Sequence, residues 1–264
     1  MKVHHLNCGT MRPPTASVVC HVLLIETGDG LVLVDAGYGL ADIAAPGARL
    51  GGTRHLLRPA LDPQETALRQ VERLGFAAAD VRHILLTHLD TDHAGGIADF
   101  PDAQVHTTAA EWTAARSPAT SIERARYRPT VWAHGPRVVT HEPQGESWHG
   151  FAAVRPLDEV APGIAMVALP GHTRGHAAYA IELGDRTLLH AGDAFYHHSV
   201  VDGRGRQPAL LTLMERMVAH DFARVQDNHA RLAELHRSPS AGVTVVSAHD
   251  PDLLEQVRSA AEGR

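Results

Sequence analysis

A ten-residue segment at positions 87–96 constrains this chain more than any other part of its sequence. It reads Thr-His-Leu-Asp-Thr-Asp-His-Ala-Gly-Gly, so two imidazoles and two carboxylates fall within six residues. The apolar run at 84–86 predicts a buried strand, and Gly95 and Gly96 allow close backbone packing where a helix begins. Four ligand-type side chains leaving one strand end favour a metal site over a polar turn that caps a helix.

Three later segments repeat the pattern of an apolar strand followed by a ligand-type residue. His172 follows the run at 164–169, Asp193 follows the run at 188–191, and His249 follows the run at 243–248. The chain holds 20 His, so a single His pair would mean little. Ligand-type residues that recur at strand ends are stronger evidence of a binding site, because open α/β sheets hold ligands just beyond the carboxyl ends of their strands.

Together these residues resemble the metallo-β-lactamase-fold superfamily of hydrolases, and look most similar to its N-acyl homoserine lactonase-like members. The superfamily motif is His-x-His-x-Asp-His, then a distant His, an Asp and a final His, and its earlier Asp-x-Gly matches Asp35-Ala36-Gly37. The matching positions are His88, Asp90, Asp92, His93, His172, Asp193 and His249. The resemblance implies an α/β fold, the αββα four-layer sandwich, as a single domain over residues 1–264 with two pseudo-symmetric halves.

The resemblance also implies a pair of divalent metal ions. The first would take His88, Asp90 and His172, the second would take Asp92, His93 and His249, and Asp193 would bridge them. Asp90 stands where the usual second His would be, so two divalent ions, three carboxylates and a hydroxide sum to zero rather than +1. The centre is then a weaker Lewis acid. Zinc is the first choice because imidazole suits it, and the carboxylate makes iron or manganese the alternatives.

The implied activity is hydrolysis of a small ester or lactone by a metal-bound hydroxide. Asp92 and Tyr196 are the expected catalytic residues. Tyr196 has the offset from Asp193 that the lactonases show, and its hydroxyl could donate to the oxyanion. Asp35 is expected to orient a ligating His. Met11 is expected to touch the substrate.

Three other activities remain open on the same fold. A thioesterase of the glyoxalase II type usually carries a basic cluster, and none is visible here beyond scattered Arg. A β-lactamase-like amide hydrolase would be expected to carry an export signal. An iron-dependent oxidoreductase is favoured by the carboxylate at Asp90.

Composition limits the partners. The net charge is −6 with no basic cluster, which argues against nucleic acid, and no run of 18 apolar residues predicts a membrane span. No secretory signal is visible, and Cys8 and Cys20 form no Cys-x-x-Cys pair, which suits reduced thiols in the cytoplasm. We expect a small-molecule substrate and a possible homodimer.

Periodicity predicts alternating strands and helices. The expected strands are 18–26, 31–35, 82–87, 105–107, 164–169, 176–183, 186–190 and 243–247, and the expected helices are 63–74, 109–115, 210–218, 222–236 and 250–261. The stretch 117–137 has little periodicity. It either shapes the substrate cleft or is an ordinary solvated insertion.

Overall fold

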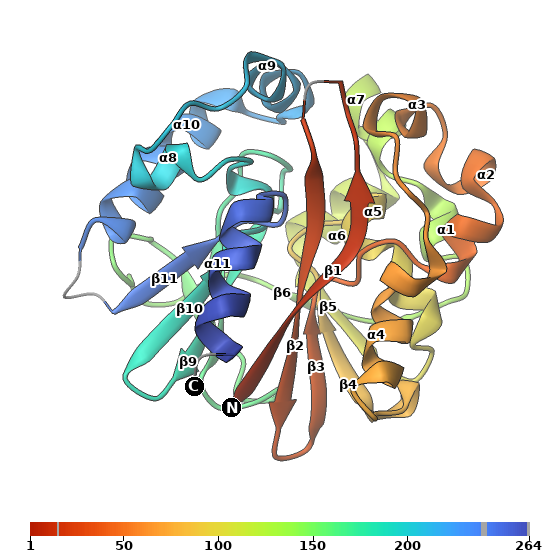
Figure 1. Cartoon of the computed structure of the whole chain (residues 1–264), viewed down its shortest axis with the longest axis horizontal. Coiled ribbons are helices and arrows are strands. Elements are labelled where there is room, and N and C mark those ends of the chain that lie inside the picture. Colours follow the sequence, from red (N-terminus) through yellow and green to blue (C-terminus); the bar gives the residue numbers. More distant parts are fainter. Residues whose placement is uncertain (15, 239–241, 263–264) are drawn as a thin grey trace.

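The computed structural model describes residues 1–14, 16–238 and 242–262. Its centre is a pair of β-sheets with helices against both outer faces (Figure 1). The first half of the chain builds one sheet and the second half builds the other. The four-layer αββα arrangement is confirmed, whereas the division into one domain of two pseudo-symmetric halves stays a prediction.

The first sheet has six strands in the order β1-β2-β3-β4-β5-β6. They are β1 (Lys2–Met11), β2 (Val18–Thr27), β3 (Gly30–Val34), β4 (Val81–Leu85), β5 (Gln104–Thr108) and β6 (Arg137–His141). The pairs β1–β2 and β2–β3 are antiparallel, whereas β3 to β6 run parallel. The segments that follow the parallel strands therefore emerge at one edge of the sheet.

The second sheet has five strands in the order β11-β10-β9-β8-β7. They are β7 (Val154–Pro156), β8 (Ile164–Ala168), β9 (Ala177–Leu183), β10 (Arg186–His190) and β11 (Val243–Val246). β9 is antiparallel to both β8 and β10, and β11 is parallel to β10. β8, β10 and β11 thus point the same way, and the loops after them meet at one edge.

Alternate residues of the inner strands enter different apolar layers. In β2, Leu24 packs outward with Val71 of a helix, while Leu23 lies between the sheets. In β9, Tyr179 lies between the sheets, while Ala178 belongs to the layer under the helices of the second sheet. Strands buried on both faces read as continuous apolar runs, which is the pattern that predicted them.

Helices α4 (Ala67–Arg73) and α6 (Ala109–Arg116) cover the first sheet, and α8 (Ser199–Asp202) and α10 (Phe222–His236) cover the second. Figure 1 shows α11 (Pro251–Glu262) between β1 and the strands β10 and β11. The remaining α-helices are α1 (Leu40–Ala44), α2 (Pro46–Leu50), α3 (Thr53–Leu57), α5 (Thr91–Ala94), α7 (Ser121–Arg126) and α9 (Ala209–Val218). The 3₁₀ turns are η1 (Pro63–Glu65), η2 (Ala78–Asp80), η3 (Gly95–Asp99), η4 (Pro129–Val131) and η5 (Gly192–Ala194).

Most of the predicted elements are found, with shifted ends. The helix expected at 63–74 is divided into η1 and α4, because the Thr66 hydroxyl accepts the Arg69 N–H and starts a new helix. The strands β1, β6 and β7 and the short helices α1, α2, α3, α7 and α8 were not predicted. The stretch 117–137 contains α7 and η4, and its helix reaches the cluster described below.

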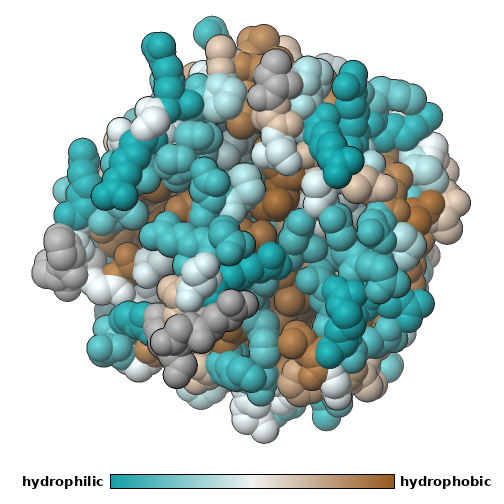
Figure 2. Space-filling model, viewed as in Figure 1, coloured by the Kyte–Doolittle hydropathy of each residue, from teal (hydrophilic) through white to brown (hydrophobic). Residues whose placement is uncertain are grey.

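The surface is mainly hydrophilic on the face drawn in Figure 2, where hydrophobic residues show mostly along its middle. None of the helices in the described ranges is long and apolar enough to cross a bilayer. The expected cytoplasmic location and homodimer stay predictions.

The buried carboxylate of Glu111, on α6, joins loops that leave the two different sheets. Its Oε1 accepts hydrogen bonds from the Leu89 N–H (3.0 Å) and the Tyr127 hydroxyl (3.1 Å). Its Oε2 accepts from the Thr173 hydroxyl (2.7 Å) and the Gly175 N–H (3.1 Å). One side of the carboxylate therefore holds the loop after β4, and the other holds the loop after β8.

Replacing Glu111 with Ala would leave these four donors without their acceptor. We expect the free energy of unfolding, measured by urea denaturation, to fall by about 3 kcal/mol or more. The matched control is Glu72→Ala, because Glu72 is exposed and pairs only with Arg69 across one helical turn. That change should cost less than about 0.5 kcal/mol. Equal losses in the two variants would contradict the bridging role.

Candidate metal centre

The side chains of the histidine-rich motif and of the later strand ends converge on one small volume. The converging residues are His88, Asp90, Asp92, His93, His172, Asp193 and His249. They leave the ends of β4, β8, β10 and β11, so both sheets contribute. Asp90 is the N-cap residue of α5, which places His93 inside a short helix. The structure therefore brings the seven predicted residues together, and their role as metal ligands stays a prediction.

Four side chains surround a first candidate position. His172 Nε2 lies 3.3 Å from Asp90 Oδ2 and 3.4 Å from Asp193 Oδ2. His88 Nε2 lies 3.4 Å from Asp90 Oδ2 and 3.8 Å from Asp193 Oδ2. Each of the two imidazole nitrogens thus lies within 3.8 Å of an oxygen of both carboxylates, and ligand atoms of His88, His172 and Asp193 all lie within 4.8 Å of one another.

A second candidate position lies on the other side of Asp193. His93 Nε2 and His249 Nε2 are each 3.1 Å from Asp193 Oδ1. Asp92 Oδ2 is 3.8 Å from His93 Nε2 and 3.5 Å from His249 Nε2. Asp193 can therefore turn one oxygen to each position, which is the geometry that a bridging carboxylate needs.

The donor set and its spacing fit two divalent ions. With metal–ligand bonds of ~2.0–2.1 Å, tetrahedral ligand atoms stand about 3.3 Å apart, close to the separations above. His88 Nε2, His93 Nε2 and Asp193 Oδ1 are buried and have no hydrogen-bond partner. Buried polar atoms are rarely left unsatisfied, so nitrogens and oxygens that face each other this way point to a cation.

All four imidazoles use Nδ1 for a partner outside the cluster. The pairs are His93 with Asp35 Oδ2 (2.8 Å), His249 with the Val19 carbonyl (2.7 Å), His88 with Thr87 Oγ1 (3.0 Å) and His172 with the Tyr196 hydroxyl (3.4 Å). An imidazole that donates its Nδ1–H to a carboxylate or carbonyl keeps its lone pair on Nε2. The outer partners of His93 and His249 therefore aim Nε2 at the candidate positions.

Asp35 lies where the sequence placed it, behind a ligating His. Its Oδ1 accepts the Thr87 N–H at 2.8 Å, and its Oδ2 lies 2.8 Å from His93 Nδ1. The side chain is buried, and the backbone has a φ of 60°, in the left-handed region. This strained turn at the end of β3 brings one carboxylate to both the start of the motif and its second His.

Charges inside the cluster decide the protonation of its members. Burial, and then the neighbouring Arg126 guanidinium, lower the pKa of His172 to about 4. Burial alone would raise the pKa of Asp193, but the imidazoles of His249 and His93 hold it well below its usual range. At neutral pH His172 is therefore neutral and Asp193 is ionised, as metal ligands must be.

Sequence reasoning missed Arg126, the last residue of α7. Its Nη1 donates to Asp90 Oδ2 (2.8 Å) and to His172 Nε2 (2.7 Å), and its Nη2 donates to the Val218 carbonyl. Only 7% of the side chain is exposed. The charge count made from the sequence omitted this cation. The one available signal was Asp90 itself, because an additional buried carboxylate requires a compensating charge.

His176 closes the loop that carries His172, and it also contacts Asp193. Its Nδ1 donates to the Leu169 carbonyl (3.1 Å), and its Nε2 accepts the Asp193 N–H (3.0 Å). Gly192, with a φ of 52°, makes the close turn possible, because a Cβ there would lie 2.7 Å from His176 Nε2.

A cavity of about 290 Å³ opens onto the cluster. Its polar side includes Asp90, Asp92, Asp193, Tyr196 and the two imidazoles His172 and His249, and its apolar side includes Met11, Val18, Leu50, Leu57, Leu211 and Met214. Three of the large apolar side chains that line it are well exposed, namely Leu56 (42%), Ile122 (44%) and Met217 (54%). They come from α3, α7 and α9, which lie at the end of the molecule away from both chain termini (Figure 1). Met11 thus lines the cavity, as expected.

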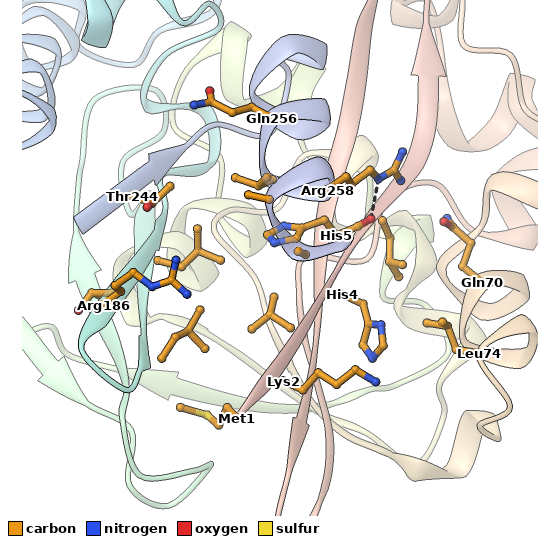
Figure 3. A pocket seen from close by; sticks show the side chains of 18 of the residues that line it. Met1, Lys2, His4, His5, Gln70, Leu74, Arg186, Thr244, Gln256 and Arg258 are labelled. Carbon is orange, nitrogen blue, oxygen red and sulfur yellow. Dashed lines mark hydrogen bonds between the residues drawn. The ribbon is translucent and has the colours of Figure 1, made fainter. Parts of the chain in front are cut away.

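A larger cavity of about 800 Å³ lies apart from this cluster, between β1, β10 and α11. Figure 3 shows Lys2, His4 and His5 of β1 on one side of it and Arg186 on another, with the Arg258 side chain bonded to the His5 carbonyl. Its lining residues include no carboxylate and none of the seven converging residues. The apolar cavity, not this basic one, adjoins the candidate metal positions.

The amino-acid sequence is similar to those of known metallo-hydrolases. Residues 17–219 match the family model described as the metallo-beta-lactamase superfamily. The chain is 52% identical over 261 residues to the "Probable metallo-hydrolase Rv2300c" of Mycobacterium tuberculosis, which covers 99% of this chain and 84% of that protein. It is 26% identical to the "N-acyl homoserine lactonase AttM" of Agrobacterium fabrum, over 99% of this chain and 93% of the relative.

Solved structures show the same fold at lower identity. An N-acyl homoserine lactone hydrolase with the product N-hexanoyl-L-homoserine bound at its catalytic metal center superposes with a TM-score of 0.71 and 21% identity, covering 98% of this chain and 95% of that one. The dizinc quorum-quenching lactonase AidC superposes with a TM-score of 0.60 and 17% identity, covering 89% and 74%.

Asp35→Asn tests whether the carboxylate behind His93 orients it. Asn tolerates the left-handed backbone, so the loop should persist while His93 loses its charged partner. We expect zinc affinity, measured by competition with a chromogenic chelator, to fall by about 10- to 100-fold. Asp29→Asn, in an exposed hairpin turn, is the control and should leave the affinity unchanged. Unchanged affinity in Asp35→Asn would remove this role.

Proposed function

Because this chain belongs to the metallo-beta-lactamase superfamily and is an enzyme of the metallo-hydrolase kind, we propose that it hydrolyses a small ester or lactone with an apolar acyl portion. The observation that carries the proposal is the union of two features. Three carboxylates and two imidazoles of the seven-residue cluster form one end of a cavity whose remaining walls are largely apolar. A polar reacting group and a hydrocarbon chain would occupy these two parts.

Seven residues would hold two divalent ions in this proposal. His88, Asp90 and His172 would bind at the first position, Asp92, His93 and His249 at the second, and Asp193 at both. When bound, the ions would supply Lewis acidity and lower the pKa of water toward neutrality. Zinc is the first choice for a set rich in imidazole, and iron or manganese are the alternatives that Asp90 keeps open.

The compounds named for two related proteins are amphipathic, which supports an amphipathic substrate for this chain. The Agrobacterium relative is named an N-acyl homoserine lactonase, and the product in the similar structure combines a hydrophilic homoserine with a hexanoyl chain. The cavity suits such a molecule, because its one Lys or Arg side chain, Arg126, already pairs with Asp90. A thioester carrying several carboxylates would find no further Lys or Arg among the lining residues.

Two residues of the chain are proposed to act on the reacting atoms. Burial, and then the carboxylates of Asp193 and Glu215, raise the pKa of Tyr196 well above its usual value. Its hydroxyl therefore stays protonated at neutral pH and can donate to the oxygen that gains charge. Asp92, which also lines the cavity, would orient the attacking water and accept its proton.

The test is a substrate panel combined with metal analysis. Lactones, aryl esters, thioesters and a chromogenic cephalosporin are offered to the purified protein, with and without chelator. We expect turnover of the lactones or esters, loss of that turnover with chelator, and its return with zinc. Within an N-acyl homoserine lactone series, kcat/KM should rise about threefold per added methylene until the cavity is filled. Stoichiometric iron with oxygen uptake and no hydrolysis would contradict the proposal.

A pair of substitutions on α9 tests the acyl part directly. Met217 lines the cavity, whereas Leu213, one turn away and equally exposed at 51%, does not. Met217→Ser should flatten the dependence of kcat/KM on chain length, and Leu213→Ser should leave it intact. The same dependence in both variants would move the acyl chain elsewhere.

Tyr196→Phe tests the donor. We expect kcat on an ester or lactone to fall about tenfold or more, with zinc content unchanged. Tyr38→Phe is the matched control, since Tyr38 also lines the cavity but its hydroxyl donates to the Met11 sulfur. Equal kcat in wild type and Tyr196→Phe would remove Tyr196 from the reaction.

A further inference from the structure

Asp90 and Arg126 form a buried ion pair at the edge of the first candidate metal position. Arg126 Nη1 lies 2.8 Å from Asp90 Oδ2, and 7% and 20% of the two side chains are exposed. The guanidinium is anchored from behind, where Nη2 donates to the Val218 carbonyl at the end of α9. Its position is thus fixed by two helices and by the carboxylate it faces.

The positive charge of Arg126 offsets the negative charge that Asp90 adds at a position where the superfamily motif has a neutral histidine. An imidazole at position 90 would be neutral, whereas Asp90 contributes −1 and Arg126 contributes +1. At this separation and degree of burial the two charges interact strongly, so they act as one neutral unit. The second position has no such partner, because no Lys or Arg nitrogen among the described residues lies within 4.0 Å of Asp92 or Asp193.

The same guanidinium also shares a ligand atom with the first position. Arg126 Nη1 is 2.7 Å from His172 Nε2, the nitrogen that faces Asp193 and Asp90. A ring nitrogen has one lone pair, which can accept an N–H or bind a cation but not both. Asp90 Oδ2 has further lone pairs and can serve both. Arg126 therefore opposes a cation at the first position by its charge and by its hydrogen bond.

We propose that Arg126 is a positioning residue that offsets Asp90 and weakens the first position, so that the two positions bind divalent cations with unequal affinity. The inference rests on the metal centre of the proposed function. In it, Asp90 and Arg126 together replace one histidine, and neither can be exchanged alone without changing the affinity of the first position.

Zinc binding by the full chain tests the pair. The two dissociation constants are measured by chelator competition, and the zinc content per chain is measured by mass spectrometry. Four variants are compared with wild type: Arg126→Gln, Arg126→Lys, Asp90→His and the double variant Asp90→His with Arg126→Gln. Arg124→Gln is the control, because Arg124 lies on the same helix, is exposed, and its side chain donates to the Ala119 carbonyl, away from Asp90.

Arg126→Gln and Asp90→His should change the dissociation constant of the weaker zinc site in opposite directions. Arg126→Gln should tighten it about tenfold or more, because a cation is removed beside it, and Asp90→His should weaken it by a similar factor. Arg126→Lys, Arg124→Gln and the double variant should stay within about threefold of wild type, on the same electrostatic argument. The tighter site should change little in any of them.

Thermal unfolding of the chelator-treated proteins gives a second readout. Arg126→Gln and Asp90→His each leave a buried charge unpaired and should unfold at a lower temperature, while the double variant should recover most of the loss. Weaker zinc binding in Arg126→Gln, or a double variant as unstable as Arg126→Gln, would overturn the inference and leave Arg126 a tether between α7 and α9. Absence of ester or lactone turnover with this zinc pattern intact would overturn the substrate class alone.

Discussion

The arrangement of the site depends on polar atoms that face one another, shielded from water, where the two sheets meet. Nitrogens of His88 and His93 and an oxygen of Asp193 are buried without partners. Burying polar atoms without hydrogen bonds costs free energy, and the surrounding chain fixes these side chains through hydrogen bonds to their other ring nitrogens. Thr87, Asp35 and the Val19 carbonyl each take an Nδ1 from behind. The fold therefore holds imidazole nitrogens and a carboxylate oxygen facing one another, which is an arrangement that a bound cation would stabilise.

Neither sheet could build this arrangement alone. The loop after β4 supplies four of the converging side chains and the loops of the second sheet supply three. Their separation is set by the apolar layer between the sheets and by direct bonds across the join, such as the His21 N–H to the Ala248 carbonyl (2.8 Å). Glu111 adds a shared acceptor for loops from both sides. The contacts that stabilise the four-layer core therefore also fix the positions of the converging side chains.

The sequence predicted what local patterns control. Apolar runs marked most inner strands, and a ligand-type residue just past a strand end is local information, so the converging side chains could be named in advance. Arg126 and Glu111 could not, because their roles depend on where α6 and α7 pack against distant loops. The strand β1 was missed because its sequence places His, Asn, Gly and Thr among the apolar residues without the regular alternation that predicts an edge strand. Helices of five or six residues, such as α1 and α7, are too short to show a periodicity.

One side of helix α7 both lines the cavity and contacts the candidate metal centre. Ile122, which lines the cavity, and Arg126, which pairs with Asp90, are four residues apart and so lie on the same side of the helix. Any substitution that tilts or shifts these six residues to suit a different acyl group also moves the guanidinium relative to its carboxylate. Evolution of substrate preference through this segment would therefore be constrained by cation affinity, and the two traits would be inherited together rather than tuned independently.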